Sequence, residues 1–224
     1  MKEFAVIVAG GTGQRMNSST PKQFLLLAGE PVLFHTIRAF HSYSKELEII
    51  VVLPGDQRTT WDDLQAEYNF AIPHSVVDGG NTRTESVKNG LSHVADNALV
   101  AIHDGVRPMI DSQTIANSFS VAKESGSAVV AVAAKDSIRK MSEGGESEAV
   151  DRSRYRLVQT PQTFQSSLIK SAYALVASDN YTDDASVLEA AGHPITLIEG
   201  NYRNIKITTP EDIAIAQALI NSIS

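Results

Sequence analysis

Short apolar runs alternate with amphipathic segments along the chain. Continuous apolar runs such as 4–8 and 48–53 predict buried strands, because a strand covered on both faces shows no polar alternation. Between the runs, apolar residues recur every three or four positions, as at Leu33, Ile37 and Phe40, which predicts helices packed on one face. Strands separated by helices require crossover connections, so the pattern predicts an α/β fold with a mostly parallel sheet and helices on both faces.

Several boundaries carry their own signals. Gly126 ends the helix expected over 111–125, and Thr209 before Pro210 caps the last one. Thr182, followed by two acidic residues, is expected to cap another helix. The remaining expected strands are 74–77, 98–103, 128–133 and 195–198, and the remaining helices are those near 57–69, 82–94, 168–175 and 185–191.

The stretch 137–159 breaks this rhythm. It is polar and charged with two adjacent glycines near its middle, Ile138 and Met141 before them, and a second apolar group that starts at Val150 after them. This arrangement predicts a β-hairpin. A hairpin with so little apolar surface is not stable alone, so we expect it to pack on a partner subunit. The chain is thus expected to be one domain, 1–224, with 137–159 as a dimerisation arm.

Composition limits the function more than the fold. A chain of 224 residues fits one sizeable domain. Its formal charge of −7 excludes a broad basic surface for nucleic acid, so any site for an anion must gather its cations locally. No apolar run approaches the roughly 20 residues of a membrane helix, the first residues make a poor signal peptide, and cysteine is absent. We expect a cytoplasmic protein with no membrane or nucleic-acid partner.

A glycine-rich segment, 8–24, follows the first expected strand, where ligands of open α/β sheets bind. Glycines let backbone N–H groups approach an anion closely, and Arg and Lys side chains add positive charge. These residues are Gly10, Gly11, Gly13, Arg15 and Lys22. The segment predicts a phosphate site over 9–22.

Two familiar glycine motifs fail on this segment. A dinucleotide fingerprint needs a third glycine where Met16 stands, and no Walker-type string occurs. The alternative is a structural turn at the end of a strand. The accompanying cations favour phosphate binding over that alternative.

Two further segments follow expected strands. Asp104 ends one of them and is suited to Mg²⁺, which takes one or two carboxylates plus substrate phosphates, while Arg107 lies within reach of the same anion. Alternatively, Asp104 caps a turn and pairs with Arg107; His103 is expected to be packed. The segment 78–87 either contacts a base or phosphate at a helix start or is only a helix cap, and alone it favours the cap.

These strings occur together in one order: AGGTGQRM, PKQF, VVDGG-x-x-R-x-x-SV, HDGVRP, VDR, QTPQ-x-F, TDDAS and NIKIT-x-PED. In that order they resemble the 2-C-methyl-D-erythritol 4-phosphate cytidylyltransferases of the non-mevalonate isoprenoid pathway. The resemblance covers nearly the whole chain. It implies a Rossmann-like nucleotidyltransferase fold, CTP and methylerythritol phosphate as substrates, Mg²⁺ as cofactor, and a homodimer joined by the hairpin.

The resemblance also implies roles for individual residues. The catalytic cations would be Arg15, Lys22, Arg152 and Lys206, with Arg152 offered across the dimer. The nucleotide would contact Ala9, Gly10, Gly11, Gly13, Gly80, Asn81, Ser86, Asp104 and Gly105, with Asp104 near the metal. The sugar phosphate would contact Arg107, Ser137 and Thr160. Without the resemblance, Lys206 would be taken for a solvent-facing lysine.

Four positions depart from the commoner family pattern, namely Gly10 and Gly105 for alanine, Ser137 for threonine and Asp184 for glutamate. All are conservative, so they leave the expected reaction unchanged. In that reaction a phosphate monoester attacks the α-phosphorus of CTP in line without a general base, and catalysis rests on positioning and electrostatics. The alternatives are ribitol 5-phosphate cytidylyltransferase, a non-catalytic nucleotide sensor, and a dinucleotide-dependent oxidoreductase, which the missing third glycine disfavours.

Overall fold

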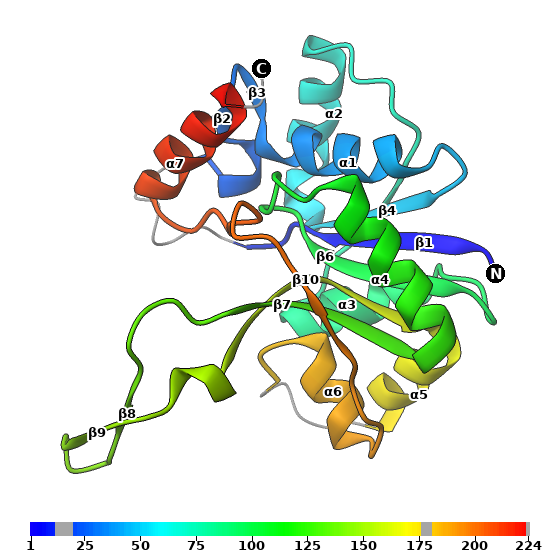
Figure 1. The fold of residues 1–224 in the computed structure, drawn as a ribbon. Coiled ribbons are helices and arrows are strands. Elements are labelled where there is room, and N and C mark those ends of the chain that lie inside the picture. Colours follow the sequence, from blue (N-terminus) through cyan, green and yellow to red (C-terminus); the bar gives the residue numbers. More distant parts are fainter. Residues whose placement is uncertain (12–19, 176–180, 223–224) are drawn as a thin grey trace.

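A seven-stranded sheet forms the centre of the computed structural model, which describes residues 1–11, 20–175 and 181–222 (Figure 1). The strand order is β11-β7-β10-β6-β1-β4-β5. The strands are β1 (Glu3–Val8), β4 (Glu48–Leu53), β5 (Ser75–Asp78), β6 (Leu99–Asp104), β7 (Ser127–Ala133), β10 (Arg156–Gln165) and β11 (Leu197–Glu199). Each apolar run that predicted a strand contributes to this sheet.

The sheet is mostly parallel, as the sequence predicts. Strand β1 pairs in parallel with both β4 and β6, β4 with β5, and β7 with β11. The exception is β10, which runs antiparallel between β6 and β7. It was not predicted, because its inner residues are polar and find their partners inside the fold: the Thr163 hydroxyl donates to Ser118 Oγ at 2.9 Å.

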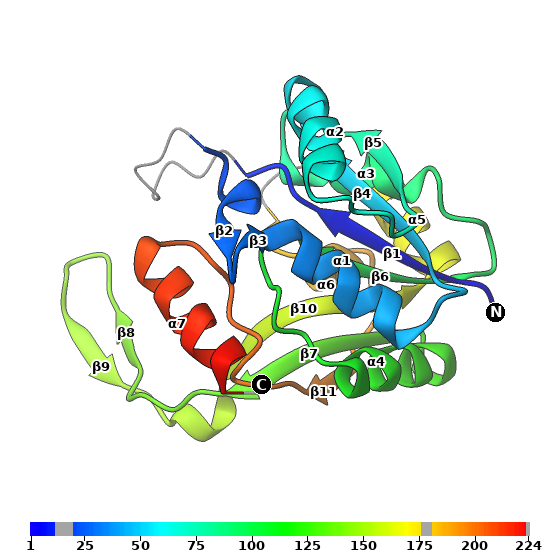
Figure 2. The ribbon, with the colours of Figure 1, turned by 90° about the horizontal axis from the view of Figure 1, so that it is seen from above.

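Helices cover both faces of the sheet. They are α1 (Val32–Tyr43), α2 (Arg58–Glu67), α3 (Arg83–Leu91), α4 (Ser112–Ser125), α5 (Ser166–Leu175), α6 (Asp184–Ala190) and α7 (Pro210–Asn221), with short 3₁₀ turns η2 (Lys22–Phe24), η3 (Gly55–Gln57) and η4 (Arg152–Arg154). Helices α1 and α4 lie over one face, and α3, α5 and α6 over the other (Figure 2). Within the described ranges, no helix is long and apolar enough to cross a membrane.

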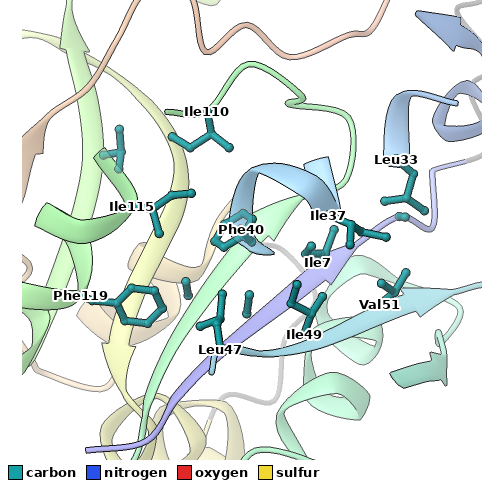
Figure 3. Close-up of a cluster of buried hydrophobic side chains, with 14 of the residues drawn as sticks. Ile7, Leu33, Ile37, Phe40, Leu47, Ile49, Val51, Ile110, Ile115 and Phe119 are labelled. Carbon is teal, nitrogen blue, oxygen red and sulfur yellow. The ribbon is translucent and has the colours of Figure 1, made fainter. Parts of the chain in front are cut away.

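Alternation along the strands divides the core into two layers. In β1, Ala5 and Ile7 belong to the cluster beneath α1 and α4, whereas Phe4 and Val6 belong to the cluster beneath α3 and α5. Figure 3 shows the first cluster, with Phe40 of α1 among aliphatic side chains from the strands. Burial on both faces fixes the register of the central strands, because a slip of one residue would exchange the layers. The strand ends that carry polar residues are therefore held in place.

The predicted helix ends are mostly confirmed. Gly126 has φ +87° after α4, and Thr209 forms a capping box with Asp212 at α7. One prediction is wrong: the N-cap of α6 is Asp183, not Thr182. Asp183 has extended backbone geometry and its carboxylate accepts from Ser186 N, so the cap lies one residue later than expected.

The expected arm is present but shorter than 137–159. Strands β8 (Arg139–Met141) and β9 (Ser147–Ala149) pair antiparallel and project away from the sheet, as Figure 1 shows. The predicted second side was wrong beyond Tyr155, because Arg156 already pairs with Ala133 as the start of β10. A second small hairpin, β2 (Leu26–Leu27) with β3 (Glu30–Pro31), precedes α1.

Candidate active site

Two neighbouring cavities lie where β1 and β6 end. The larger, about 350 Å³, is bounded by the segment after β1 and by the start of α3. Its lining includes Ala9, Gly10, Gly11, Lys22, Gly80, Asn81, Ser86, Asp104 and Lys206. These residues come from separate parts of the sequence, and they meet because parallel strands present their carboxyl ends at one edge of the sheet.

Lys22 lies directly against the glycine segment. A Cβ built on Gly11 would be 2.8 Å from Lys22 Cε and 3.1 Å from its Nζ. A side chain at position 11 would therefore require the flexible end of Lys22 to move. The ammonium group and the backbone of Gly11 together form one wall of the larger cavity.

The segment before α3 forms the opposite wall. Gly80 N donates to Ser86 Oγ at 3.1 Å, and that hydroxyl donates to Thr82 O at 2.9 Å. Thr82 caps the helix by accepting from Glu85 N at 3.1 Å. The helix cap favoured by the sequence is thus present, and the same cap holds Gly80, Asn81 and Ser86 at the cavity.

The smaller cavity, about 220 Å³, adjoins the first on the side of β10. It is polar, and its lining includes Arg83, Asp104, Arg107, Thr160, Gln162, Asp183 and Lys206. Arg107 is held at both ends of its guanidinium: Nε donates to Asp104 Oδ2 at 3.1 Å and Nη1 to Asn204 O at 2.9 Å. The lining of this second cavity holds three cationic side chains and two carboxylates, and this excess of cations suits an anionic ligand.

Asp104 lies between two cations. Arg107 Nε and Lys206 Nζ each lie 3.1 Å from the same carboxylate oxygen, Oδ2. Burial disfavours the charged carboxylate, but the surrounding cations outweigh burial and hold the pKa of Asp104 well below its ordinary range. The pairing with Arg107 that the sequence offered as an alternative is present, and it places the carboxylate in the site. The Lys206 side chain is 40% exposed, so it faces solvent as expected by default, but its ammonium group also pairs with Asp104.

His103 supports this carboxylate from the core. It is fully buried, and burial lowers its pKa to about 4, so the ring is neutral. A neutral imidazole carries one N–H. Because the carbonyl Arg107 O can only accept, Nε2 donates to it at 3.2 Å, and Nδ1 then accepts from the Thr160 hydroxyl at 3.1 Å. Thr160 Oγ1 in turn accepts from Asp104 N at 3.0 Å. Thr160 thus ties β10 to the end of β6, and His103 is packed as expected.

Gly105 lies behind the site. It does not line either cavity, and a Cβ there would be 2.9 Å from the Cβ of Ala9 and 3.2 Å from Val8 O. Its carbonyl accepts from the Thr36 hydroxyl at 2.9 Å. The expected contact with nucleotide stays a prediction; what the structure shows is that Gly105 allows the ends of β1 and β6 to pack closely.

Besides Gly105, two described residues of the predicted site, Ser137 and Arg152, line neither cavity of their own chain. Both are exposed and belong to the arm. Gly13 and Arg15 lie outside the described residues. Arg152 Nη1 donates to Lys135 O at the base of the arm.

Sequence reasoning missed Arg83 as a site residue. Its guanidinium forms a bidentate ion pair with the buried Asp184, with N–O distances of 2.9 and 2.6 Å, and it lines both cavities. The signal was available: the arginine is one of the fixed letters in the string VVDGG-x-x-R, and Asp184 was noted only as a departure from glutamate. From the sequence alone, an arginine and an aspartate that form a buried ion pair cannot be told from an arginine and an aspartate that face solvent.

The sheet and site together define a nucleotidyltransferase: two cation-lined cavities, one against a glycine segment, meet at the carboxyl edge of an α/β sheet. A family model described as 2-C-methyl-D-erythritol 4-phosphate cytidylyltransferase matches residues 4–222. The chain belongs to this family, as its sequence pattern suggests.

Individual relatives agree with the family match. The chain is 47% identical over 220 residues to 2-C-methyl-D-erythritol 4-phosphate cytidylyltransferase of Bacteroides thetaiotaomicron, covering 98% of this chain and 100% of the relative. Among solved structures, the enzyme of the same name from Thermus thermophilus has a TM-score of 0.80 at 31% identity, covering 99% and 100% of the two chains. The 4-diphosphocytidyl-2C-methyl-D-erythritol synthase of Anaerococcus prevotii has a TM-score of 0.83 at 28% identity, covering 98% and 99%.

Proposed function

We propose that this chain transfers CMP from CTP to 2-C-methyl-D-erythritol 4-phosphate, giving 4-diphosphocytidyl-2-C-methyl-D-erythritol and pyrophosphate. The observation that carries the proposal is the junction of the two cavities, which share Asp104 and Lys206. A nucleotide in the larger cavity and a sugar phosphate in the smaller one would bring their phosphates together at that junction. The membership in the family supports this choice of substrates.

In this reaction an oxygen of the sugar phosphate attacks the α-phosphorus of CTP in line. The bond from that phosphorus to the bridging oxygen breaks, and its electron pair leaves with pyrophosphate. A phosphate monoester dianion is already a nucleophile, so the reaction needs no general base and depends on positioning and charge. Lys22 stabilises charge on the nucleotide phosphates, while Arg107 and Lys206 hold the attacking phosphate. Arg15 is assigned to the same charge stabilisation by family resemblance.

Asp104 is the carboxylate suited to hold Mg²⁺. Both protein cations contact Oδ2, the low pKa keeps the carboxylate ionised, and Mg²⁺ commonly takes one carboxylate plus substrate phosphates. The described residues contain no cluster of three metal-ligating side chains, so substrate would supply the other ligands. Bound there, the ion would neutralise charge on the leaving pyrophosphate.

The arm supports a homodimer. Ser137 and Arg152 lie outside the cavities of their own chain, and apolar side chains are exposed on the arm and at the start of β10 beside it, with Met141 61% and Leu157 53% exposed. Both observations would be explained if the arm packs on a second copy and offers Arg152 to its smaller cavity. The cytoplasmic location expected from the sequence stays a prediction.

A direct test is pyrophosphate release from CTP and Mg²⁺ with methylerythritol 4-phosphate, compared with ribitol 5-phosphate. We expect release with the first polyol phosphate and at most slow release with the second. Faster release with ribitol 5-phosphate would replace the proposed substrate, and no release with either would refute the transferase activity of this chain.

Lys22→Ala separates catalysis from nucleotide binding. Because Lys22 stabilises charge that builds during transfer, we expect kcat to fall by about 10²- to 10³-fold, with a much smaller rise in the Kd of CTP measured by calorimetry. Lys45→Ala is the control, since Lys45 is exposed and lines neither cavity. Near-normal turnover in Lys22→Ala would remove Lys22 from the mechanism.

A further inference from the structure

A third cation lies at the junction of the two cavities. Three residues line both of them, namely Arg83, Asp104 and Lys206. Asp104 and Lys206 already have roles in the proposed reaction, but Arg83 has none. It is the first residue of α3, and its guanidinium reaches the carboxylate of Asp184 at the start of α6.

Asp184 fixes this guanidinium in one orientation. Its two carboxylate oxygens accept from Nη1 and Nη2 of Arg83 at 2.9 and 2.6 Å, the planar fork geometry that constrains both groups. Asp184 is fully buried and also accepts from the Tyr173 hydroxyl at 2.5 Å. The Arg83 side chain remains 30% exposed, and the residue lines both cavities.

The start of α6, and with it Asp184, is anchored to the sheet. Gln162 of β10 donates from Nε2 to Asp183 Oδ2 at 2.9 Å and accepts from Ala185 N at 2.7 Å. These bonds lie on either side of Asp184 along the chain. The Asp184 carboxylate is therefore fixed relative to β10. Through the ion pair, the Arg83 guanidinium is held in place relative to β10 as well.

The charge of Arg83 acts at the junction. Burial opposes that charge, but the carboxylate of Asp184 outweighs burial and raises the pKa of Arg83 above its ordinary value. Arg83 is also one of the cations that lower the pKa of Asp104, so its field reaches the central carboxylate. A buried ion pair contributes little net stability compared with an apolar pair of similar size, which favours a positioning role over a purely structural one.

We propose that Arg83 is a substrate-contacting cation of the transfer reaction and that Asp184 positions its guanidinium at the junction of the two cavities. The ligand is phosphate: a guanidinium has five N–H donors, Asp184 engages two, and the forked geometry of the others matches phosphate oxygens. The inference rests on the proposed function, because it requires phosphates to meet at the junction. Arg83 would bind them from α3, together with Lys206 from the segment that precedes α7.

The test compares Arg83→Gln, Asp184→Asn and Asp184→Glu with the wild type in the pyrophosphate-release assay. We expect kcat to fall by about 10- to 100-fold in Arg83→Gln and about 10-fold in Asp184→Asn, with a smaller rise in the KM of CTP. Asp184→Glu keeps the charge and should retain kcat within about threefold. Arg38→Gln is a matched control: Arg38 forms a bidentate pair with Glu30 but lines neither cavity, so its kcat should stay within about twofold.

Thermal unfolding followed by circular dichroism accompanies each assay, which is run well below the unfolding midpoint. A folded Arg83→Gln with kcat within about twofold of the wild type would overturn the proposal, as would equal losses in Asp184→Glu and Asp184→Asn. If Asp184→Asn does not fold, Arg83→Gln and Asp184→Glu still decide the question. A wild type that releases no pyrophosphate would refute the proposed function instead, so the two failures are distinguishable.

Discussion

The cavity junction and the arm use charged residues in opposite ways. At the junction, Asp104 and Asp184 are buried, and each is held by cations from distant parts of the chain. On the arm, all residues of β8 and β9 are exposed, and the Lys140–Glu148 pair lies 3.5 Å apart in solvent. Exposed pairs contribute little because water screens them, whereas buried groups fix geometry.

The two regions also differ in how far their own chain supports them. The junction is supported by core strands and has its charged groups paired within one chain. The arm has no such support: Tyr155, Leu157 and Val158 at its base are 42–53% exposed. A short two-stranded hairpin with exposed apolar residues is not stable alone. This exposed apolar surface is the observation that supports the proposed packing of the arm on a second copy.

The largest expected effect is at the junction. Lys206→Ala removes the cation 3.1 Å from Asp104 and should lower kcat by about 10²- to 10³-fold, because the carboxylate loses one of its two cationic partners and the attacking phosphate loses a cation proposed to hold it. Lys140→Ala on the arm removes a solvated cation and should leave kcat within about twofold. Steady-state kinetics gives kcat for both variants. Similar losses of kcat in the two would show that the junction and the arm do not differ in this way.

A smaller effect is expected on assembly. Leu157→Asp places a charge on the apolar base of the arm and should raise the dimer dissociation constant by about tenfold or more, measured by sedimentation velocity. Ile215→Asp is the control, since Ile215 is 50% exposed on α7 and belongs to no arm element. A wild type that is monomeric at micromolar concentration would contradict the role given to the arm.

The smallest effect concerns packing. A Cβ at position 105 would lie 2.9 Å from Ala9 Cβ, whereas at Gly144 the nearest atom is Ser142 Oγ at 3.8 Å. We expect Gly105→Ala to lower the free energy of unfolding by about 1–2 kcal/mol, and Gly144→Ala to change it by less than about 0.5 kcal/mol. Urea unfolding of both variants checks this, and equal values would show that the floor of the site is not closely packed.

The sequence predicts the parallel strands better than the contacts between segments that are distant along the chain. The apolar runs of β1, β4 and β6 mark buried parallel strands, so the position of Asp104 at a strand end follows directly. Strand β10 has no such pattern, because Gln162 and Thr163 are satisfied by partners that are distant in sequence. Its absence from the prediction also misplaced the end of the arm.

The same limit applies to the site. Strand-end position and residue type identify Lys22 and Asp104 as candidates, but nothing local distinguishes Lys206 or Arg83 from surface cations. Their roles depend on Asp104 and Asp184, which lie 102 and 101 residues away along the chain. The Arg83–Asp184 pair appears only once α6 is anchored to β10, and the Lys206–Asp104 pair only once the segment before α7 bonds to the residues after β6.

The central claim is that the active site is assembled from the cavities of one chain and the arm of another. Lys206→Ala damages the cavities and Arg152→Ala the arm, so each homodimer should be nearly inactive. After subunit exchange at equal concentrations, mixed dimers retain one intact site, and about a quarter of wild-type pyrophosphate release should return, because half of the dimers are mixed. Recovery near that level is the predicted result. Activity that stays at the mean of the two parents would show that the arm does not complete the site of its partner.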